Sequence, residues 1–223
     1  MSNRLFAIGD IHGCFDPFKE MVENRIRLTP DDRLVLLGDY IDRGPGSKQV
    51  IDYIMNLRSR GFNLITLTGN HEVMLLDALR DDSNLALWIY NGGSPTLESF
   101  NVDSVKDLDH KYVNFFRELK YYCSLEDYLF VHAGFNDELN DPFSEIYPMI
   151  WRCRREYNHP QLRNKSIVHG HCIVPVNECR KRVAHNPKVI DIDTGCVYTN
   201  FPGYGHLTAI ELYSMELFSV PAE

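Results

Sequence analysis

Histidines, aspartates and an asparagine gather at the ends of short apolar runs in this 223-residue chain. Each run stops at a polar loop that contains glycine, as Leu5–Ile8 does before Gly9-Asp10-Ile11-His12-Gly13. The side chains that follow such runs are Asp10, His12, Asp39, Asn70, His71, His132, His169 and His171. Carboxylate and amide oxygens with imidazole nitrogens, and no thiolate, suit divalent manganese, iron or zinc better than calcium.

These side chains are more numerous than one cation needs. The oxygen donors are Asp10, Asp39 and Asn70, and the imidazoles are His12, His132 and His171. A single tetrahedral ion with an open position cannot use them all. They fit two ions about 3.5–4 Å apart that share one carboxylate. Each residue alone has an ordinary structural explanation, such as a turn aspartate or a buried histidine. Their joint occurrence favours a dinuclear metal centre.

Three more residues indicate what such a centre would do. Arg43 lies in the stretch GDYIDRG, residues 38–44, and a guanidinium binds phosphate oxygens bidentately. His71 directly follows Asn70, and a histidine in that position is a natural general acid for a leaving alcohol. Asp42 can orient this histidine and keep it protonated. The combination predicts chemistry on a phosphate ester.

The motifs resemble the signature of the phosphoprotein phosphatase family of metallophosphoesterases. The matching stretches are GDIHG (9–13), GDYIDRG (38–44), GNHE (69–72), His132-Ala133-Gly134, Gly170-His171, WIYNGGSPTLESF (88–100) and Asp193-Thr194-Gly195. Their spacing is most similar to the bacterial and phage, lambda-phosphatase-like branch, which also contains the symmetrical diadenosine tetraphosphate hydrolases. The resemblance spans residues 5–212.

The resemblance implies a role for each matching residue. It assigns one ion to Asp10, His12 and Asp39, and the second ion to Asp39, Asn70, His132 and His171. A hydroxide between the ions attacks phosphorus, Arg43 and Asn70 contact the substrate, and His71 paired with Asp42 protonates the leaving oxygen. The ions of this branch are usually manganese, and iron or zinc are the alternatives.

Two places depart from the family pattern. The last metal histidine is commonly followed by Thr-Pro, whereas His171 is followed by Cys172-Ile173, so His169 competes with His171 as the ligand. A second phosphate-binding arginine often stands two residues after a tryptophan, and here that position holds Cys153. Arg152 and Arg154, on either side of it, both remain possible for this role.

The elements that must position these residues follow from the hydrophobic pattern. Short apolar runs bounded by glycine predict buried strands, and residues 207–220 predict two strands around Tyr213-Ser214. Residues 17–27, 47–60, 71–80 and 109–119 predict helices, the second capped by Ser47 and stopped by Gly61. Strands alternating with helices predict an α/β fold. The resemblance narrows this to a calcineurin-like β-sandwich flanked by helices, as one domain over residues 1–223 with a looser insertion near 84–126.

Charge and composition exclude some classes of protein. The net charge of −8 argues against a nucleic-acid binder, and no stretch is apolar enough to span a membrane. Residues 151–182 nevertheless carry eight Arg and Lys against two Glu, a local charge of +6 that can attract phosphate. The six cysteines form no C-x2-C pair, which argues against a structural zinc site. A chain of this size does not need disulfides and Met1–Ile8 does not resemble a signal peptide, so we expect reduced thiols and a cytoplasmic location. Cys14 and Cys172 lie close enough to the motifs to make the site sensitive to oxidation.

The sequence therefore predicts a metal-dependent phosphomonoester hydrolase, first of all a serine/threonine protein phosphatase acting on phosphorylated protein or small phosphoesters. A symmetrical diadenosine tetraphosphate hydrolase is the alternative, because it would use the same metal chemistry. An inactive scaffold and a protein with purely structural metal are further hypotheses. A scaffold would have no need for Asp10, His12, Asp39, Arg43, Asn70 and His71 together.

Overall fold

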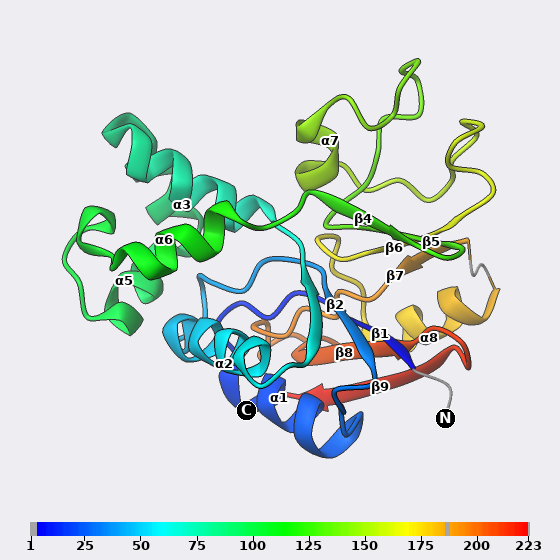
Figure 1. Cartoon of the computed structure of the whole chain (residues 1–223), viewed down its shortest axis with the longest axis horizontal. Coiled ribbons are helices and arrows are strands. Elements are labelled where there is room, and N and C mark those ends of the chain that lie inside the picture. The colour runs from blue at the N-terminus through cyan, green and yellow to red at the C-terminus, as the bar shows by residue number, and fades with distance from the viewer. Residues whose placement is uncertain (1–3, 186–187, 223) are drawn as a thin grey trace.

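Two β-sheets stack in the computed structural model, which describes residues 4–185 and 188–222 (Figure 1). One sheet has the strand order β3-β2-β1-β8-β9 and the other β4-β5-β6-β7. The strands are β1 (Leu5–Ile8), β2 (Arg33–Leu36), β3 (Asn63–Thr66), β4 (Tyr122–Leu125), β5 (Tyr128–Val131), β6 (Ser166–His169), β7 (Val189–Asp191), β8 (His206–Glu211) and β9 (Glu216–Pro221).

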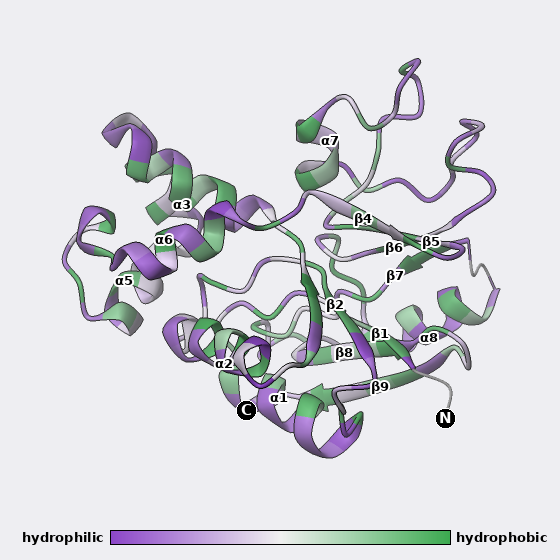
Figure 2. Ribbon diagram, viewed as in Figure 1, coloured by the Kyte–Doolittle hydropathy of each residue, from purple (hydrophilic) through white to green (hydrophobic). Residues whose placement is uncertain are grey.

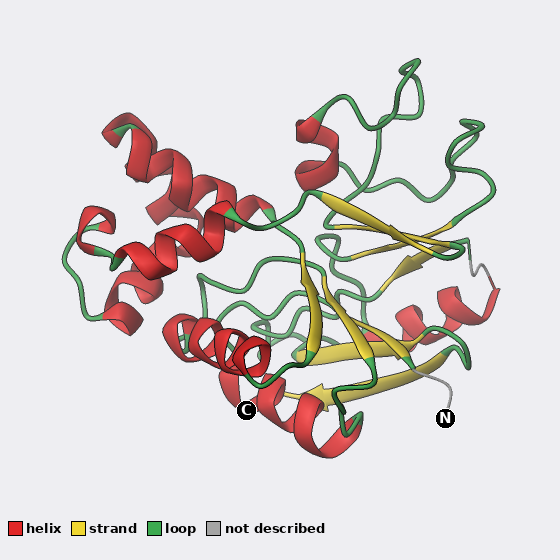
Figure 3. Cartoon of the chain, viewed as in Figure 1, coloured by secondary structure: helices red, strands yellow, loops and turns green. Residues whose placement is uncertain are grey.

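Helices surround the two sheets (Figure 3). They are α1 (Phe15–Glu20), α2 (Ser47–Ser59), α3 (Asn70–Arg80), α4 (Leu85–Trp88), α5 (Ser94–Phe100), α6 (His110–Arg117), α7 (Ile146–Trp151) and α8 (Val176–His185). Most carry apolar and polar residues in alternation along their length, as expected for helices with one buried face (Figure 2). In the described part of the chain, none is both long and apolar enough to cross a membrane.

Strand β1 shows how the layers are held together. Successive side chains of a strand point to opposite faces of the sheet. Leu5 and Ala7 belong to the apolar cluster between the sheets, which includes Phe130 of β5. Phe6 and Ile8 belong to the cluster that the sheet shares with helices α1 and α2. All four β1 side chains are fully buried, so this strand is the centre of the sandwich.

The predicted fold is confirmed, with corrections at two helices. Every described strand except β4 lies where an apolar run predicts it, within about a residue at each end, and the chain forms an α/β sandwich flanked by helices. The pattern does not predict β4 or the helices α4, α5, α7 and α8. The helix predicted over 17–27 is α1 followed by a π-helical turn at Met21–Arg25. Ser47 is not the cap of α2, because Gly46 occupies that position. The Ser47 hydroxyl instead accepts a hydrogen bond from the Asp42 amide.

Residues 84–126 contain α4, α5, α6 and β4. Trp88 and Phe116 of this stretch are buried in the same cluster as α2 and the outer face of β1. The stretch therefore packs against the core through large aromatic side chains. The assignment of the whole chain to one domain stays a prediction.

The strand directions bring distant loops to one edge of the sandwich. Strands β1, β2 and β3 are mutually parallel, and so are β5, β6 and β7. The loops at the carboxyl ends of parallel strands lie at the same edge, which is where α/β proteins bind ligands. Gly38 in the loop after β2 has φ +108°, and a Cβ there would lie 2.6 Å from the Gly69 amide nitrogen. Only glycine lets the loops after β2 and β3 approach this closely.

Asp32 ties the N-terminal strand to the turn before β2, and Asp32→Asn is expected to destabilise the fold. Its buried carboxylate accepts hydrogen bonds from Arg4 and from the Thr29 amide and hydroxyl. Burial raises the pKa of Asp32, but these hydrogen bonds outweigh it and hold the pKa below its usual value. The stabilisation is therefore present above the unfolded pKa of about 3.9 and is lost as pH falls through the folded pKa.

We expect Asp32→Asn to lower the free energy of unfolding by about 1.5–3 kcal/mol at pH 7, since hydrogen bonds to a charged group are lost. The difference should shrink at pH 3. Denaturant unfolding at both pH values measures it, with the exposed neighbour variant Asp31→Asn as the control. Equal stability of wild type and Asp32→Asn at pH 7 would contradict this expectation.

Candidate active site

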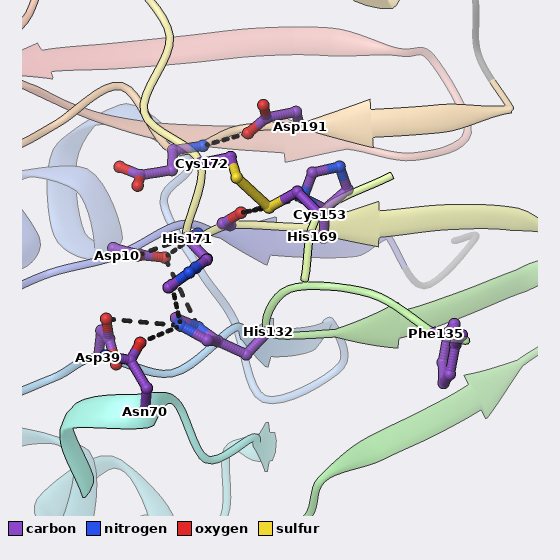
Figure 4. Close-up of a disulfide and its surroundings, with 12 residues drawn as sticks. Asp10, Asp39, Asn70, His132, Phe135, Cys153, His169, His171, Cys172 and Asp191 are labelled. Carbon is purple, nitrogen blue, oxygen red and sulfur yellow. Dashed lines mark hydrogen bonds and ion pairs between the residues drawn. A yellow bond between two sulfur atoms is a disulfide. The ribbon is translucent and has the colours of Figure 1, made fainter. Parts of the chain in front are cut away.

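The predicted metal ligands converge at this edge of the sandwich (Figure 4). Figure 4 shows Asp10, Asp39, Asn70, His132 and His171 directed toward one another from separate loops. Asp10 and His12 follow β1, Asp39 follows β2, Asn70 begins α3, His132 follows β5 and His171 follows β6. Residues more than 150 positions apart in the sequence thus share one small volume.

Asp39 lies at the centre of the group. Its Oδ2 atom is 3.5 Å from His12 Nε2 and 3.5 Å from His132 Nε2. The ligand atoms of His12, Asp39 and His71 all lie within 4.8 Å of one another, and so do those of Asp39, His132 and His171. Asp39 is the member that both sets share, which is the arrangement that a carboxylate bridging two ions requires.

The imidazoles are oriented by backbone carbonyls. His12 Nδ1 lies 2.9 Å from the Ile41 carbonyl oxygen, and His132 Nδ1 lies 3.0 Å from that of Leu37. Because each Nδ1 donates to a carbonyl, each Nε2 presents a lone pair to the site. Hydrogen bonds from the second ring nitrogen to backbone carbonyls are the usual way in which metal-ligating histidines are oriented.

In the second set of candidate ligands, His132 Nε2 faces two further polar atoms. His132 Nε2 lies 3.1 Å from Asn70 Oδ1 and 3.2 Å from His171 Nδ1. His132 Nε2 is an acceptor because Nδ1 of this ring donates to the Leu37 carbonyl. It and the Asn70 oxygen are two acceptors this close together, which repel each other unless a cation lies between them. The donor set therefore fits a divalent cation.

Buried carboxylates point to the same conclusion. Burial raises the pKa of Asp39 well above its usual value, and the charge of Glu72 raises it further. Burial and then the charge of Asp193 raise the pKa of Asp10 in the same direction. Keeping these groups ionised away from water is costly unless positive charge is near. Two divalent cations would supply that charge.

His71 and Asp42 form a buried pair beside this group. His71 Nδ1 lies 2.7 Å from Asp42 Oδ2. Asp42 also accepts hydrogen bonds from Trp88 Nε1 (2.8 Å) and the Thr96 hydroxyl (2.7 Å), so its orientation is held from three sides. Among the described residues, His71 Nε2 is the buried side-chain polar atom left without a hydrogen-bond partner, and the Asp39 carboxylate lies 4.0 Å from it. A nitrogen in that condition is available to a bound substrate.

The site stores backbone strain. Five candidate residues adopt the left-handed region that non-glycine residues rarely occupy: His12 (φ 46°), Asp39 (49°), Asp42 (71°), Arg43 (68°) and His171 (65°). Arg43 and His171 are each the central residue of a γ-turn, because Gly44 donates to the Asp42 carbonyl and Cys172 to the Gly170 carbonyl. A γ-turn with positive φ is rare and strained, and strain of this kind concentrates at functional sites.

The arginines differ in their surroundings. The Arg43 guanidinium lies in the site, with Nη1 2.6 Å from His12 Nε2 and Cζ 5.8 Å from the centre of the Tyr198 ring. Arg154 forms ion pairs with Asp137 and Glu138. Arg152 is exposed, lies over the Tyr147 ring and has no acidic partner within the described residues. Of the two alternatives, Arg152 is therefore the one that is free to meet an anion.

The structure also distinguishes His171 from His169. His169 is the last residue of β6, is paired in register with Asp191, and points away from the ligand group toward Cys153 (Figure 4). His171 lies beyond the strand end and joins Asp39 and His132. The Asp10 carboxylate is at the margin of the group, where it accepts the His171 amide hydrogen bond at 3.1 Å. Its role as a metal ligand stays a prediction.

Several supporting residues have no role in the sequence analysis. Glu72 accepts hydrogen bonds from the backbone amides of Asp39, Tyr40 and Gly69, which fixes the loops after β2 and β3 to each other. Trp88 and Thr96 hold Asp42. The signal was present, since Glu72 ends the GNHE stretch and Trp88 and Thr96 lie in WIYNGGSPTLESF. Most of their hydrogen-bond partners lie in other motifs, so the local sequence does not reveal which groups they hold.

The expectation that all six cysteines are reduced is wrong for one pair. Cys153 and Cys172 form a disulfide, with their Cα atoms 6.4 Å apart. This separation is in the usual range for a disulfide, and no local spacing in the sequence indicates the pairing. Cys14, Cys123, Cys179 and Cys196 are free thiols.

Comparison with known proteins agrees with this geometry. The chain is 27% identical over 239 residues to the "Bis(5'-nucleosyl)-tetraphosphatase PrpE [asymmetrical]" of Bacillus subtilis (strain 168), covering 96% of this chain and 93% of that protein. It is 27% identical over 282 residues to the "Bis(5'-nucleosyl)-tetraphosphatase, symmetrical" of Legionella pneumophila (strain Lens), covering 97% and 96%.

Solved structures share the fold. A structure described as a putative diadenosine tetraphosphatase matches with a TM-score of 0.71 at 20% identity, over 100% of this chain and 95% of that one. A protein serine/threonine phosphatase from Saccharomyces cerevisiae matches with a TM-score of 0.67 at 16% identity, over 99% and 80%. The family model of the calcineurin-like phosphoesterases matches residues 4–203. The chain therefore belongs to the calcineurin-like phosphoesterase family and is a metallophosphoesterase, a family that uses a dinuclear divalent metal centre.

Proposed function

We propose that this enzyme hydrolyses dinucleoside polyphosphates such as diadenosine tetraphosphate, with manganese as the preferred ion. The observation that carries the proposal is a rim of aromatic and basic side chains next to the metal site. The names of the two full-length relatives support it. A serine/threonine protein phosphatase, the first prediction from the sequence motifs, is the second hypothesis and is decided by the same experiment.

The rim extends from His171 along α7. The Trp151 ring meets the His171 ring edge-on, with centroids 5.8 Å apart, and the Tyr147 ring lies 6.4 Å from Trp151. Tyr147 is 60% exposed, and the Arg152 guanidinium lies 5.8 Å from its ring centre. An exposed aromatic ring with an adjacent cation suits a nucleobase joined to a phosphate chain, because every base has a π-face and every phosphate a negative charge.

The residues of the site divide the chemical work. When bound, two divalent cations supply Lewis-acid activation of water and neutralise charge on the phosphoryl group. We assign Asp10, His12, Asp39, Asn70, His132 and His171 to holding these cations. Arg43 and Arg152 bind phosphoryl oxygens, and Asn70 also contacts the substrate. In the structure Arg43 Nη1 lies 2.6 Å from His12 Nε2, so the guanidinium must leave this contact once Nε2 binds a cation.

His71 donates a proton from Nε2 to the leaving oxygen. Burial lowers the pKa of His71 to about 2 and raises that of Asp42 to about 7, so burial by itself disfavours the imidazolium that proton donation requires. A phosphate anion arriving beside Nε2 favours the charged imidazolium, since opposite charges attract strongly away from water. Asp42 keeps the ring in the orientation that directs Nε2 at the substrate.

A substrate panel tests the proposal. The chelator-treated enzyme, reloaded with Mn²⁺, is expected to hydrolyse diadenosine tetraphosphate with a kcat/KM at least about fivefold above that for phosphoserine and phosphothreonine peptides, because one stacked base contributes about 1–3 kcal/mol. Chelation should stop turnover without unfolding the protein, whereas a structural metal would melt it. Product chromatography reports the position of cleavage: two ADP for symmetrical hydrolysis, ATP and AMP for asymmetrical.

Tyr147→Ala provides the matched control. It should raise the KM for the dinucleotide and leave that for the phosphopeptides unchanged. A preference for phosphopeptides in the wild-type enzyme would instead establish the protein-phosphatase hypothesis. No turnover of either substrate, with or without Mn²⁺, would indicate a scaffold.

A further inference from the structure

The disulfide joins two loops of the metal site (Figure 4). Cys172 directly follows His171, and Cys153 stands two residues after the end of α7. The bond closes a sequence separation of 19 residues. It therefore connects the neighbour of a predicted metal ligand to the segment that carries Trp151 and Arg152.

His171 needs restraint to keep its conformation. It is the centre of a γ-turn with φ 65°, in which Cys172 donates to the Gly170 carbonyl at 2.7 Å. Such strained residues persist only where the surrounding structure holds them in place. Its amide donates to Asp10, and its ring meets the Trp151 ring edge-on with centroids 5.8 Å apart. The first restraint comes from the loop after β1 and the second from the chain just before Cys153.

The disulfide restrains both the turn that contains His171 and the segment that carries Trp151. Cys172 is the residue that closes the γ-turn, so a bond at its side chain limits the ways in which the turn can open. Cys153 anchors the segment whose Trp151 ring packs edge-on against the imidazole, and its sulfur lies 3.7 Å from the Gly170 carbonyl oxygen. Without the bond, only noncovalent contacts hold the turn and the segment together.

We propose that the Cys153–Cys172 disulfide is a positioning element for His171, so that binding of the second divalent ion depends on the redox state of this pair. The proposal rests on the metal-ligand role assigned to His171 above. Interactions that orient a metal ligand typically contribute about 10–100-fold to metal affinity. Among the interactions that orient His171, the disulfide is the covalent one.

The reaction that operates the switch is thiol–disulfide exchange with a dithiol. Two electrons and two protons pass from the dithiol to the protein, the S–S bond breaks into two S–H groups, and the dithiol closes to its own disulfide. Both cysteines are half-buried and line a cavity of about 480 Å³ together with Arg154 and Ile173. A reductant can therefore approach the sulfurs from the side away from the ligand group.

Calorimetric titration with Mn²⁺ measures the effect. Oxidised protein is compared with protein that was reduced with dithiothreitol and then freed of reagent under argon. We expect the second ion to bind about tenfold more weakly after reduction and the first ion to bind equally well, with saturating Mn²⁺ restoring kcat. The double variant Cys153→Ser/Cys172→Ser should bind like the reduced protein and no longer respond to dithiol. Cys123→Ser, on β4, should respond as wild type does.

Three outcomes would overturn the inference. The first is equal affinity for the second ion in the oxidised and reduced wild type. The second is a lower melting temperature after reduction with unchanged metal affinity, which indicates a purely structural disulfide. The third is a response to dithiol that persists in the double variant. His171→Ala separates this inference from the proposed function, because two ions bound to that variant would refute the ligand assignment itself.

Discussion

His71→Asn is expected to lower kcat by about 10²–10⁴-fold on substrates with a poor leaving group while the protein keeps its metal. The imidazole is fully buried, its Nδ1 is held by Asp42 at 2.7 Å, and its Nε2 has no partner in the described structure. A ring held at one nitrogen and open at the other is suited to proton donation. Asparagine can be accommodated in the space of the ring but cannot donate a proton as a general acid.

The leaving group provides the control for this expectation. An aryl phosphate whose phenol is acidic needs no protonation, so His71→Asn should lose far less activity on it than on an alkyl phosphate. An equal loss on both substrates would exclude the acid role. Metal analysis is needed as well, because the His71 ligand atom lies within 4.8 Å of those of His12 and Asp39. A lower metal content in the variant would identify His71 as a ligand instead.

Asp39→Asn is expected to reduce bound metal from two ions to fewer than one per chain and to reduce activity to background. Asp39 Oδ2 lies 3.5 Å from a histidine nitrogen of each candidate set, and both sets include this carboxylate. An amide removes the negative charge that both ions need. Its oxygen is also a weaker ligand for a hard divalent cation than a carboxylate oxygen.

Elemental analysis after exhaustive dialysis measures this effect. Asp52→Asn is the matched control, because Asp52 lies on α2, is partly exposed and pairs with Lys48. Two ions in the Asp39→Asn protein would contradict the bridging role. This variant should remain folded, since its amide oxygen can still accept the His71 backbone hydrogen bond that Asp39 Oδ1 accepts at 3.1 Å. Circular dichroism checks this point.

Much of the fold could be predicted from local pattern. The β1 run is apolar on both faces because this strand is buried between helices and a second sheet, and such continuous runs are typical of central strands. The helix over 17–27 was less predictable. A π-helical turn begins at Met21, and helical spacing in the sequence cannot distinguish this wider turn from a regular one. The cap prediction fails at Ser47 because its hydroxyl bonds to Asp42 and Thr96, which lie outside its own helix.

The sequence by itself determined which donor types follow which strands, and it predicted a phosphate-binding role for Arg43 and a pairing of His71 with Asp42. These features are local, since a loop directly after a strand end has its position set by that strand. Only the tertiary structure shows that His171, and not His169, joins Asp39 and His132, and that Arg154 is held in an ion pair. It also reveals the Cys153–Cys172 bond and the hydrogen bonds of Trp88 and Thr96 to Asp42. Each of these depends on a partner from a distant segment. Local spacing carries no information on which distant side chains become neighbours, because that is settled by the stacking of the two sheets.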